Sequence, residues 1–326
     1  MSKFDATLIG CQAGWRKYEG NPIIGDENDF KFDNHVVKLE DKYRMYYSWR
    51  NHYSIAMTES LDGIHWSEPV LVIQPRPETG WEDDINRGTI VYKDGFYQMW
   101  YSGQTTGGVE MESDEWTEAY LEASTNESGT SAIGYATSED GVNWQRYDEP
   151  VILPSEDWEM QSLMCPSVIW DEEEEIYKMW YCGGEWFEPN AIGYATSKDG
   201  VHWEKYSGNP MYTANPENIW ERARVAGPHV VKRNDWYYMF YIGYEDLFKA
   251  RMCLARSRDG VTGWERHPEN PIISPGAPGG WECESIYKPF VMYEEELGRW
   301  TMWYNARQGT IERIGMAMHD GEDLGF

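Results

Sequence analysis

The strongest constraint on the fold is a short segment that recurs along the chain. IGYATSEDGVNW at 133–144 returns almost unchanged as IGYATSKDGVHW at 192–203. Weaker copies keep the same pattern, and they are IAMTESLDGIHW at 55–66, MCLARSRDGVTGW at 252–264 and IGMAMHDG at 314–321. A segment that returns at intervals of this size indicates one structural unit repeated along the chain.

Other recurring segments surround each copy and define the unit. An alternating run rich in aromatic residues precedes each copy, at 43–49, 97–103, 177–183, 237–243 and 301–306. Alternation of this kind is typical of β-strands. An apolar stretch such as HVVKL or PSVIW comes before each run, and a short stretch such as PVIL or NPII follows the turn. Each unit is therefore predicted to hold four short antiparallel strands.

Five such units predict an all-β fold, namely a five-bladed β-propeller with four antiparallel strands per blade. The predicted blades span approximately 33–75, 84–154, 160–213, 223–274 and 284–321. The last unit stops after its third strand, but WRKYEGNPII at 15–24 matches WEKYSGNPMY at 203–212. We therefore expect the amino-terminal strand to complete the last blade and close the ring, so that residues 1–326 form a single propeller domain.

The net charge and the cysteines indicate which partners and which cellular compartment to expect. The 56 acidic residues outnumber the 28 basic ones, for a formal net charge of -28. Such a surface repels phosphate backbones and anionic lipids, so we expect neither nucleic acid nor a membrane as partner. The five cysteines are scattered without CxxC spacing, and the first residues lack the pattern of a secretory signal. These features favour reduced thiols and a cytoplasmic protein.

Two recurring motifs are interpreted as architecture. Ser-x-Asp-Gly, followed by Trp, suits a tight turn between the third and fourth strands. A Trp-Glu pair precedes the first strand of four blades, at 81–82, 158–159, 220–221 and 281–282. Because both motifs recur with the fold, functional residues are expected where the repeat is broken.

The candidate site lies on the face where loops lead into the innermost strands and join the second and third strands. The residue at the start of each innermost strand differs between blades, and the aligned set is Asp33, Arg87, Cys165, Gly227 and Lys288. Further polar or aromatic residues that break the repeat in these loops are His52, Asp84, Glu185, Trp186, Arg224, Glu245, Glu284 and Arg307. Carboxylates, guanidinium groups and rings around one channel suit a sugar. Satisfied surface ion pairs are the alternative explanation for any one of them.

At this point the chain resembles the five-bladed propeller glycosidases of glycoside hydrolase families 43 and 32 and, more loosely, family 130. FDNHVV at 32–37 is similar to the Asp-Pro motif of those families, which implies that Asp33 is the base or nucleophile. Two expected carboxylates are replaced, because MCPSVIW at 164–170 has Cys165 before its proline and AGPHVV at 226–231 has Ala226 in place of the acid.

Cleavage of a glycosidic bond needs a second group that protonates the leaving oxygen. We expect Glu284, then Asp84, then Glu185 to supply this acid, through a pKa raised by burial or by a neighbouring carboxylate. The predicted function is therefore that of a glycoside hydrolase acting on a small carbohydrate substrate. No cofactor motif and no metal-ligand spacing is apparent, so neither is expected.

Two other functions remain open. Arg87, Arg224 and Lys288 offer a cationic pocket for phosphate, as in a phosphorylase of the family 130 type. The replacement at Ala226 instead favours a carbohydrate-binding propeller without catalysis. The acidic insert from Thr105 to Ser131 is a candidate lid or contact of a homo-oligomer.

Overall fold

A computed structural model describes residues 10–28, 30–105, 129–185, 189–246 and 248–326. The expected all-β class is confirmed, since the regular structure consists of strands and short 3₁₀ turns. The turns in the described residues are η1 (Arg50–His52), η2 (Pro77–Thr79), η3 (Asp157–Glu159) and η4 (Ile219–Glu221). No helix in this part of the chain has the length and apolar character needed to cross a membrane.

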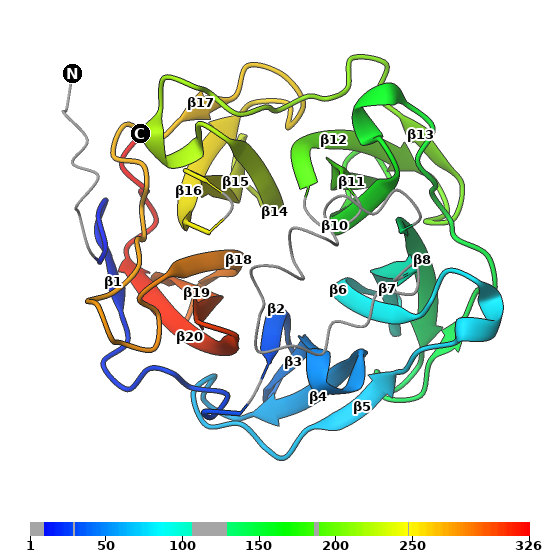
Figure 1. The fold of residues 1–326 in the computed structure, drawn as a ribbon, viewed down its shortest axis with the longest axis horizontal. Helices are drawn as coiled ribbons and strands as arrows, with labels where there is room; N and C mark the ends of the chain where they lie inside the picture. Colours follow the sequence, from blue (N-terminus) through cyan, green and yellow to red (C-terminus); the bar gives the residue numbers. More distant parts are fainter. Residues whose placement is uncertain (1–9, 29, 106–128, 186–188, 247) are drawn as a thin grey trace.

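The strands form consecutive antiparallel groups in which the chain runs outward from the first strand to the fourth. One four-stranded sheet comprises β2 (Lys31–Lys38), β3 (Tyr43–Trp49), β4 (Ser54–Ser60) and β5 (Val70–Ile73). Another comprises β14 (Arg224–Arg233), β15 (Trp236–Tyr244), β16 (Ala250–Ser257) and β17 (Glu265–Arg266). Figure 1 shows these strand groups arranged around a common centre, with the first strand of each on the inside.

An eight-stranded sheet contains two further groups. The first group is β6 (Asp84–Lys93), β7 (Phe96–Thr105), β8 (Thr130–Ser138) and β9 (Gln145–Arg146). The second group is β10 (Ser162–Asp171), β11 (Ile176–Gly184), β12 (Pro189–Ser197) and β13 (Trp203–Lys205). A parallel pairing of Ser162 with Ser131 joins the two, which explains why they count as one sheet.

The remaining sheet unites the two ends of the described chain. It comprises β18 (Ser285–Glu294), β19 (Arg299–Gln308), β20 (Ile311–Asp320) and, beside β20, the strand β1 (Trp15–Lys17). Trp15 pairs with His319 and Lys17 with Ala317 in antiparallel register. The predicted pairing of the amino-terminal strand with the last sheet is therefore confirmed.

The fourth strands differ in one respect from the sequence prediction. The ladder forms directly after the turn, over Gln145–Arg146, Trp203–Lys205 and Glu265–Arg266. The predicted PVIL, NPMY and NPII segments make only isolated bridges, such as those of Ile152 with Ile133 and of Tyr212 with Ile192. Each segment contains a proline, which lacks the N–H of a ladder, but a proline alone does not prevent a strand, since PVLVI at 69–73 forms β5 directly after Pro69.

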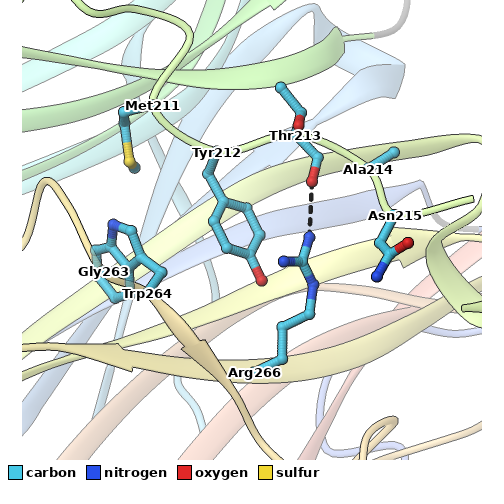
Figure 2. Close-up of a pocket in the computed structure, with 8 residues that line it drawn as sticks. All are labelled: Met211, Tyr212, Thr213, Ala214, Asn215, Gly263, Trp264 and Arg266. Atoms are coloured by element: carbon cyan, nitrogen blue, oxygen red, sulfur yellow. Dashed lines mark hydrogen bonds between the residues drawn. The ribbon is translucent and has the colours of Figure 1, made fainter.

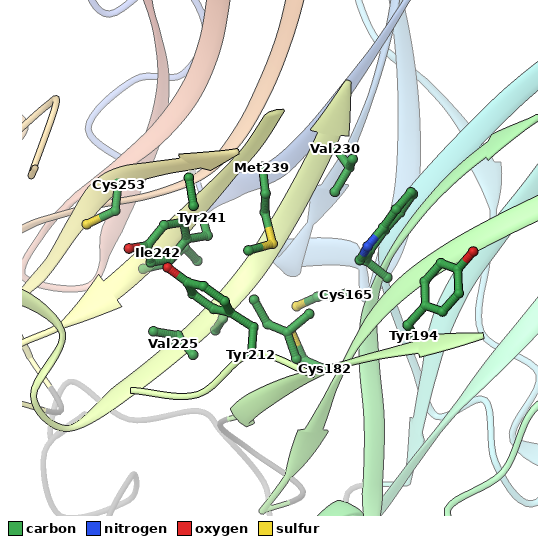
Figure 3. Packing of buried hydrophobic residues seen from close by; sticks show 14 of the residues in the cluster. Cys165, Cys182, Tyr194, Tyr212, Val225, Val230, Met239, Tyr241, Ile242 and Cys253 are labelled. Carbon is green, nitrogen blue, oxygen red and sulfur yellow. The ribbon is translucent and has the colours of Figure 1, made fainter. Parts of the chain in front are cut away.

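The core consists of apolar clusters between neighbouring groups. Figure 3 shows one of them, in which Cys165, Cys182 and Tyr194 of the β10–β13 group meet Val225 and Met239 of the β14–β17 group. The largest fully buried side chains are aromatic, among them Trp100, Trp180, Trp300 and Trp303. Replacing one such ring by alanine costs about 3–5 kcal/mol, so these seams dominate stability.

One hydrogen bond recurs across the seams. A side chain of the second strand donates to the carbonyl of a turn glycine in the neighbouring group: Trp100 to Gly200 at 2.8 Å, Trp180 to Gly260 at 2.7 Å and Trp303 to Gly63 at 3.0 Å. The bond from Trp303 connects the β18–β20 sheet with the β2–β5 sheet. The first and last groups therefore meet through the same contact as their neighbours.

The turn glycines belong to the Ser-x-Asp-Gly motif, whose structural interpretation is confirmed. In the copy at 138–141, the Ser138 hydroxyl accepts from the Gly141 N–H, and Asp140 accepts from the N–H groups of Val142 and Asn143. These bonds hold the Asp140 pKa well below its usual range, with the Asn143 backbone bond as the largest cause. The motif thus closes its own turn.

The Trp-Glu pairs form what we call rim clamps, each made of a buried glutamate, a tyrosine of the second strand and a cation of the fourth strand. The clamps are Glu82 with Tyr101 and Arg146, Glu159 with Tyr181 and Lys205, Glu221 with Tyr241 and Arg266, and Glu282 with Tyr304 and Lys17. The tyrosine hydroxyls donate at 2.6 to 2.9 Å. The glutamates of these pairs are therefore structural, as predicted.

Candidate active site

The candidate site is built on a backbone irregularity shared by the innermost strands. In β2, β6, β10, β14 and β18 the register with the second strand shifts near the start of the strand. The residue at this shift has a left-handed φ, and the set is Asp33 (54°), Arg87 (56°), Cys165 (54°), Gly227 (52°) and Lys288 (49°). Bulges of this kind redirect side chains. These are the five residues that the sequence alignment placed at one position.

Neighbouring groups hold these bulges in place. The Asp33 N–H donates to Asn305 Oδ1 at 3.2 Å, and the Arg87 N–H donates to Ser48 Oγ at 2.9 Å. The Cys165 N–H likewise donates to Ser102 Oγ at 3.2 Å. Each acceptor lies on the second strand of another group, so a position that is costly for a non-glycine residue is stabilised by cross-group bonds.

Asp33 is the carboxylate at this position and it is buried, with 4% of its surface exposed. Its Oδ2 atom lies 3.6 Å from Nε of Arg87. Burial raises the pKa of Asp33, while the positive charges of Arg87, Lys288 and Arg50 oppose that rise. A carboxylate that is desolvated yet surrounded by cations is a typical catalytic base or nucleophile.

Asp84 enters the same electrostatic environment through Arg50, one of the polar residues that the sequence places at the ends of the second strands. Arg50 of η1 forms an ion pair with Asp84, the first residue of β6. Asp84 is buried and adds to the rise in the pKa of Asp33. Because Asp84 is bound to Arg50, it is better suited to position that guanidinium than to donate a proton.

A second buried carboxylate, Glu312, lies near Asp33. Glu312 is the second residue of β20 and pairs with Arg307 across the β19–β20 hairpin. It also forms a bridge with Phe30, just before β2. Burial raises the pKa of Glu312; Tyr287 and Arg307 oppose the rise, and the charge of Asp33 adds to it.

Sequence analysis missed Glu312 although a signal was present. In the aligned copies, the residue two before the conserved aliphatic position of the third strand is Tyr53, Ser131, Asn190, Ala250 or Glu312. Only the last is acidic. This position lies at the start of the third strand, beyond the ends of the second strands from which the candidates were taken.

Unmet hydrogen-bonding capacity gathers around these two carboxylates. Buried atoms without a hydrogen-bond partner in the described residues include Asp33 Oδ2, both side-chain polar atoms of Asn34, Asn305 Nδ2 and Glu312 Oε2. Asn34 follows Asp33 directly, and Asn305 accepts from the Asp33 N–H. Buried polar groups are nearly always paired, so this concentration indicates where a polar ligand binds. We call Asp33, Arg50, Arg87, Lys288 and Glu312 the central cluster.

Glu284, the first choice for the acid, lies at the edge of the candidate site. It precedes β18, its side chain is 46% exposed, and its carboxylate lies 3.9 Å from Nε of Arg307. It therefore lacks the burial that was one of the two expected reasons for its role as acid, and that role stays a prediction. Arg307 also donates to the Phe248 carbonyl at 3.2 Å.

Other predicted residues form separate contacts. Glu185 forms an ion pair with Arg224 at 3.1 Å, and Glu245 forms one with Arg251 at 2.8 Å. His52 is exposed and its ring lies 4.3 Å from that of Trp49. Trp186 lies outside the described residues, as do residues 106–128 of the predicted insert.

Two histidines lie further along the innermost strands. The rings of His35 and His229 are 4.5 Å and 4.4 Å from that of Phe290. Burial lowers the pKa of His229 to about 4, so the ring is neutral at physiological pH. Within the described residues, no group of three or more histidine, cysteine, aspartate or glutamate side chains is arranged to hold a metal ion. All five cysteines are free thiols.

Comparisons with known proteins agree with this geometry. The sequence model described as Glycosyl hydrolases family 43 matches residues 20–317. A 1,2-beta-oligomannan phosphorylase from Thermoanaerobacter sp. (strain X514) is 26% identical over 255 residues, covering 77% of this chain and 75% of the relative. A solved glycoside hydrolase is similar in structure with a TM-score of 0.70 at 19% identity, covering 93% of this chain and 90% of the other. A thermostable family-43 glycoside hydrolase has a TM-score of 0.66 at 17% identity, covering 91% of each.

Proposed function

The chain belongs to glycosyl hydrolase family 43, and on that premise we propose that it hydrolyses a glycosidic bond with Asp33 and Glu312 as its carboxylate pair. The substrate class is an oligosaccharide or a simple glycoside. The family match supports a glycosyl-acting enzyme. The assignment of Asp33 and Glu312 as the carboxylate pair is our proposal, and it rests on the residues of this chain.

One observation carries the proposal. Asp33 and Glu312 are both buried, burial raises the pKa of each, and the charge of Asp33 adds to the rise in the pKa of Glu312. Each also has an oxygen without a hydrogen-bond partner among the described residues. Two carboxyl groups that repel each other in a desolvated site share protons unequally, which is the arrangement that acid–base cleavage needs.

The surrounding cations assign the roles. Arg87, Lys288 and Arg50 all favour the ionised form of Asp33. Arg307 and Arg50 favour the ionised form of Glu312, but three cations act on Asp33. We therefore assign the proton to Glu312, which donates it to the glycosidic oxygen as the bond to the anomeric carbon breaks. In one route Asp33 removes a proton from the water that attacks the anomeric carbon, and solvent then takes that proton from Asp33 and returns one to Glu312. In the other route Asp33 attacks the anomeric carbon, and water deprotonated by Glu312 then breaks the bond between the sugar and Asp33.

Phosphorolysis is a second candidate that a specific observation favours. Three cations act on Asp33 from different elements, namely Arg50 from η1, Arg87 from β6 and Lys288 from β18. Such a set suits the oxygens of inorganic phosphate as attacking group. The relative named 1,2-beta-oligomannan phosphorylase also supports this route.

The products formed with and without inorganic phosphate test both candidates. Purified protein is incubated with β-1,2-linked mannooligosaccharides, xylooligosaccharides, arabinooligosaccharides and aryl glycosides, and products are separated by anion-exchange chromatography. Free reducing sugar that forms without phosphate, and is lost in Asp33→Asn, supports hydrolysis. A sugar 1-phosphate that forms only with phosphate replaces hydrolysis by phosphorolysis. Activity that survives unchanged in Asp33→Asn contradicts the proposed pair in either reaction.

We also propose that the strand groups are the blades of one closed five-bladed propeller, with residues 1–326 as its domain. Support comes from β1, which pairs with β20 and supplies Lys17 to the last rim clamp. A core cluster that includes Val36 and Trp303 packs the β2–β5 sheet against the β18–β20 sheet. Deleting residues 1–24 should lower the Tm markedly, and an unchanged Tm would contradict closure through β1.

A further inference from the structure

A pocket on the outer side of the strand groups lies apart from the central cluster. Its volume is about 470 Å³, and its lining includes Tyr212, Thr213, Asn215, Gly263, Trp264 and Arg266. Figure 2 shows the ring of Trp264 and the ring of Tyr212 on one side, with Asn215 across the pocket and the Arg266 guanidinium between. The lining comes from the segment after β13 and from the turn and strand around β17. The pocket therefore lies at the seam between two groups.

The repeat is broken at this pocket. In the copies at 138–144 and 197–203, the tryptophan follows the motif serine by the same spacing, whereas the copy at 257–264 holds one extra residue. Trp144 Nε1 donates to the Gly141 carbonyl at 3.2 Å, and Trp203 Nε1 donates to the Gly200 carbonyl at 2.9 Å. Trp264 Nε1 is buried without a hydrogen-bond partner among the described residues.

The extra residue changes the turn that leads to the pocket. Gly263 precedes Trp264, has a left-handed φ of 60°, and has open space where a Cβ would stand. Left-handed conformations favour glycine, so this position lets the turn lengthen without strain. Like Trp264, Trp66 has an Nε1 atom without a hydrogen-bond partner among the described residues although its copy has the ordinary length, so the extra residue and not the lost bond is what distinguishes this copy.

The polar group in the pocket is held rigidly. Arg266 Nε donates to Glu221 Oε1 at 2.6 Å, and Nη2 donates to the Thr213 carbonyl at 2.7 Å. The guanidinium lies over the Tyr212 ring at 4.5 Å, and that ring is 6.3 Å from Trp264 at an interplanar angle of 74°. Arg266 Nη1 makes no hydrogen bond to a described residue. Because Glu221 balances the charge of Arg266, the pocket is suited to neutral hydroxyl groups more than to an anion.

We propose that this pocket is a second carbohydrate-binding site, which holds a sugar unit of a polysaccharide away from the point of cleavage. Aromatic rings contact the C–H face of a pyranose, while fixed N–H groups donate to its hydroxyls. Trp264 supplies the ring and Arg266 the N–H group, with the Asn215 amide opposite. The buried Tyr212 ring supports the guanidinium. The inference rests on the proposed function only in assuming that the chain meets polysaccharides, since the pocket shares no residue with the central cluster.

Affinity gel electrophoresis tests the site. The Asp33→Asn protein, chosen to prevent cleavage, is run in native gels with xylan, arabinan, yeast mannan or inulin. We expect at least one polysaccharide to slow it, and Asp33→Asn/Trp264→Ala to associate about tenfold more weakly with that polysaccharide. Trp264→Phe keeps a smaller ring in the same place, so it should show an intermediate loss. Trp203→Ala is the matched control, because Trp203 occupies the same repeat position outside the pocket.

Three outcomes overturn the inference: no polysaccharide slows the Asp33→Asn protein, Trp264→Ala leaves the retardation unchanged, or Trp203→Ala reduces it equally. Turnover of aryl glycosides by Trp264→Ala in the wild-type background separates this result from the proposed function. That turnover should remain within twofold, because a small aryl glycoside has no sugar to reach the pocket. If the pocket does not bind polysaccharide but aryl glycosides are turned over normally, only the second binding site is refuted and the proposed function stands.

Discussion

The rim clamps and the central cluster use the same kinds of side chain in opposite ways. At the rim, a buried glutamate such as Glu159 meets a tyrosine hydroxyl, a lysine and two backbone N–H groups. In the centre, Asp33 and Glu312 each keep an oxygen without a partner among the described residues. The rim pattern repeats between groups, whereas the central position carries a different residue in each. Where the repeat is kept, polar groups satisfy one another; where it is broken, they are left for a ligand.

The largest expected effect concerns the centre. Asp33→Asn keeps the volume of the side chain but removes the negative charge that the reaction requires. We expect kcat/KM on the best substrate to fall by about 10⁴-fold, near the upper limit for loss of a positioned proton-transfer group. The measurement is the initial rate on that substrate, with the far-UV spectrum as a check of folding. A fall in kcat/KM of less than tenfold would contradict the view that the central cluster, unlike the rim clamps, serves catalysis.

Glu312→Gln should produce the next largest effect. A carboxyl that donates a proton must be protonated, so its raised pKa predicts that wild-type activity falls on the alkaline side. We expect about a 10²- to 10³-fold loss of kcat on substrates with poor leaving groups, and a smaller loss with activated aryl leaving groups. The pH profile of kcat/KM should lose its alkaline limb in this variant.

Glu284→Gln is the matched control for that experiment. The Glu284 carboxylate is half exposed and near Arg307. Its removal should leave kcat within twofold and leave both limbs of the pH profile in place. If Glu284→Gln loses the alkaline limb while Glu312→Gln keeps it, the assignment of the acid is reversed.

Glu159→Gln tests the rim side of the comparison. Glu159 is fully buried, and its loss of charge leaves Lys205 without its partner. Breaking a buried ion pair from one side costs about 3–5 kcal/mol, which should appear in the free energy of unfolding measured with urea. Activity per folded molecule should stay within twofold. Glu204→Gln, at an exposed position of β13, should change neither quantity.

The smallest effect is a gain in stability. A folded-state pKa above the ordinary value means that the folded protein binds the Asp33 proton more tightly than the unfolded chain does. Stability from this group is therefore present at low pH and is lost as the pH rises through the ordinary value of 3.8 to the raised one. Asp33→Asn should raise the Tm and the free energy of unfolding at pH 7 but not at pH 3, since each unit of upward shift in the pKa corresponds to about 1.4 kcal/mol of stability. A lower Tm at pH 7 would show that Asp33 is stabilising, like the rim glutamates.

Sequence predicted the repeated parts well because repetition averages out local ambiguity. The second strands, the Ser-x-Asp-Gly turns and the pairing of residues 15–17 with the last sheet all followed from aligned copies. The alignment also placed Asp33, Arg87 and Lys288 at one structural position. Their roles stay predictions, as do those of the other candidate residues.

The remaining features depend on geometry that alignment does not carry. Glu284 and Ser285 are neighbours in the sequence, yet Glu284 is exposed whereas Ser285, the first residue of β18, is buried. Side chains alternate in direction along a strand, and a bulge shifts that alternation, so a one-residue offset decides which side chain faces inward. The ion pair of Arg50 with Asp84 joins η1 to β6, and it became apparent only from their position in space.

The shared left-handed bulge has a consequence for how such a chain diversifies. Because four of the five positions already hold a side chain without altering the strand, new chemistry can be gained by exchanging one residue at a time around a conserved frame. Gly227 is the exception, since a Cβ there would stand 2.5 Å from Ile242 Cδ1. In laboratory evolution, diversity should therefore enter first at Arg87, Cys165 and Lys288. A library at Gly227 should yield fewer folded variants than one at Cys165, and shortening Ile242 in the same clone should recover part of the difference.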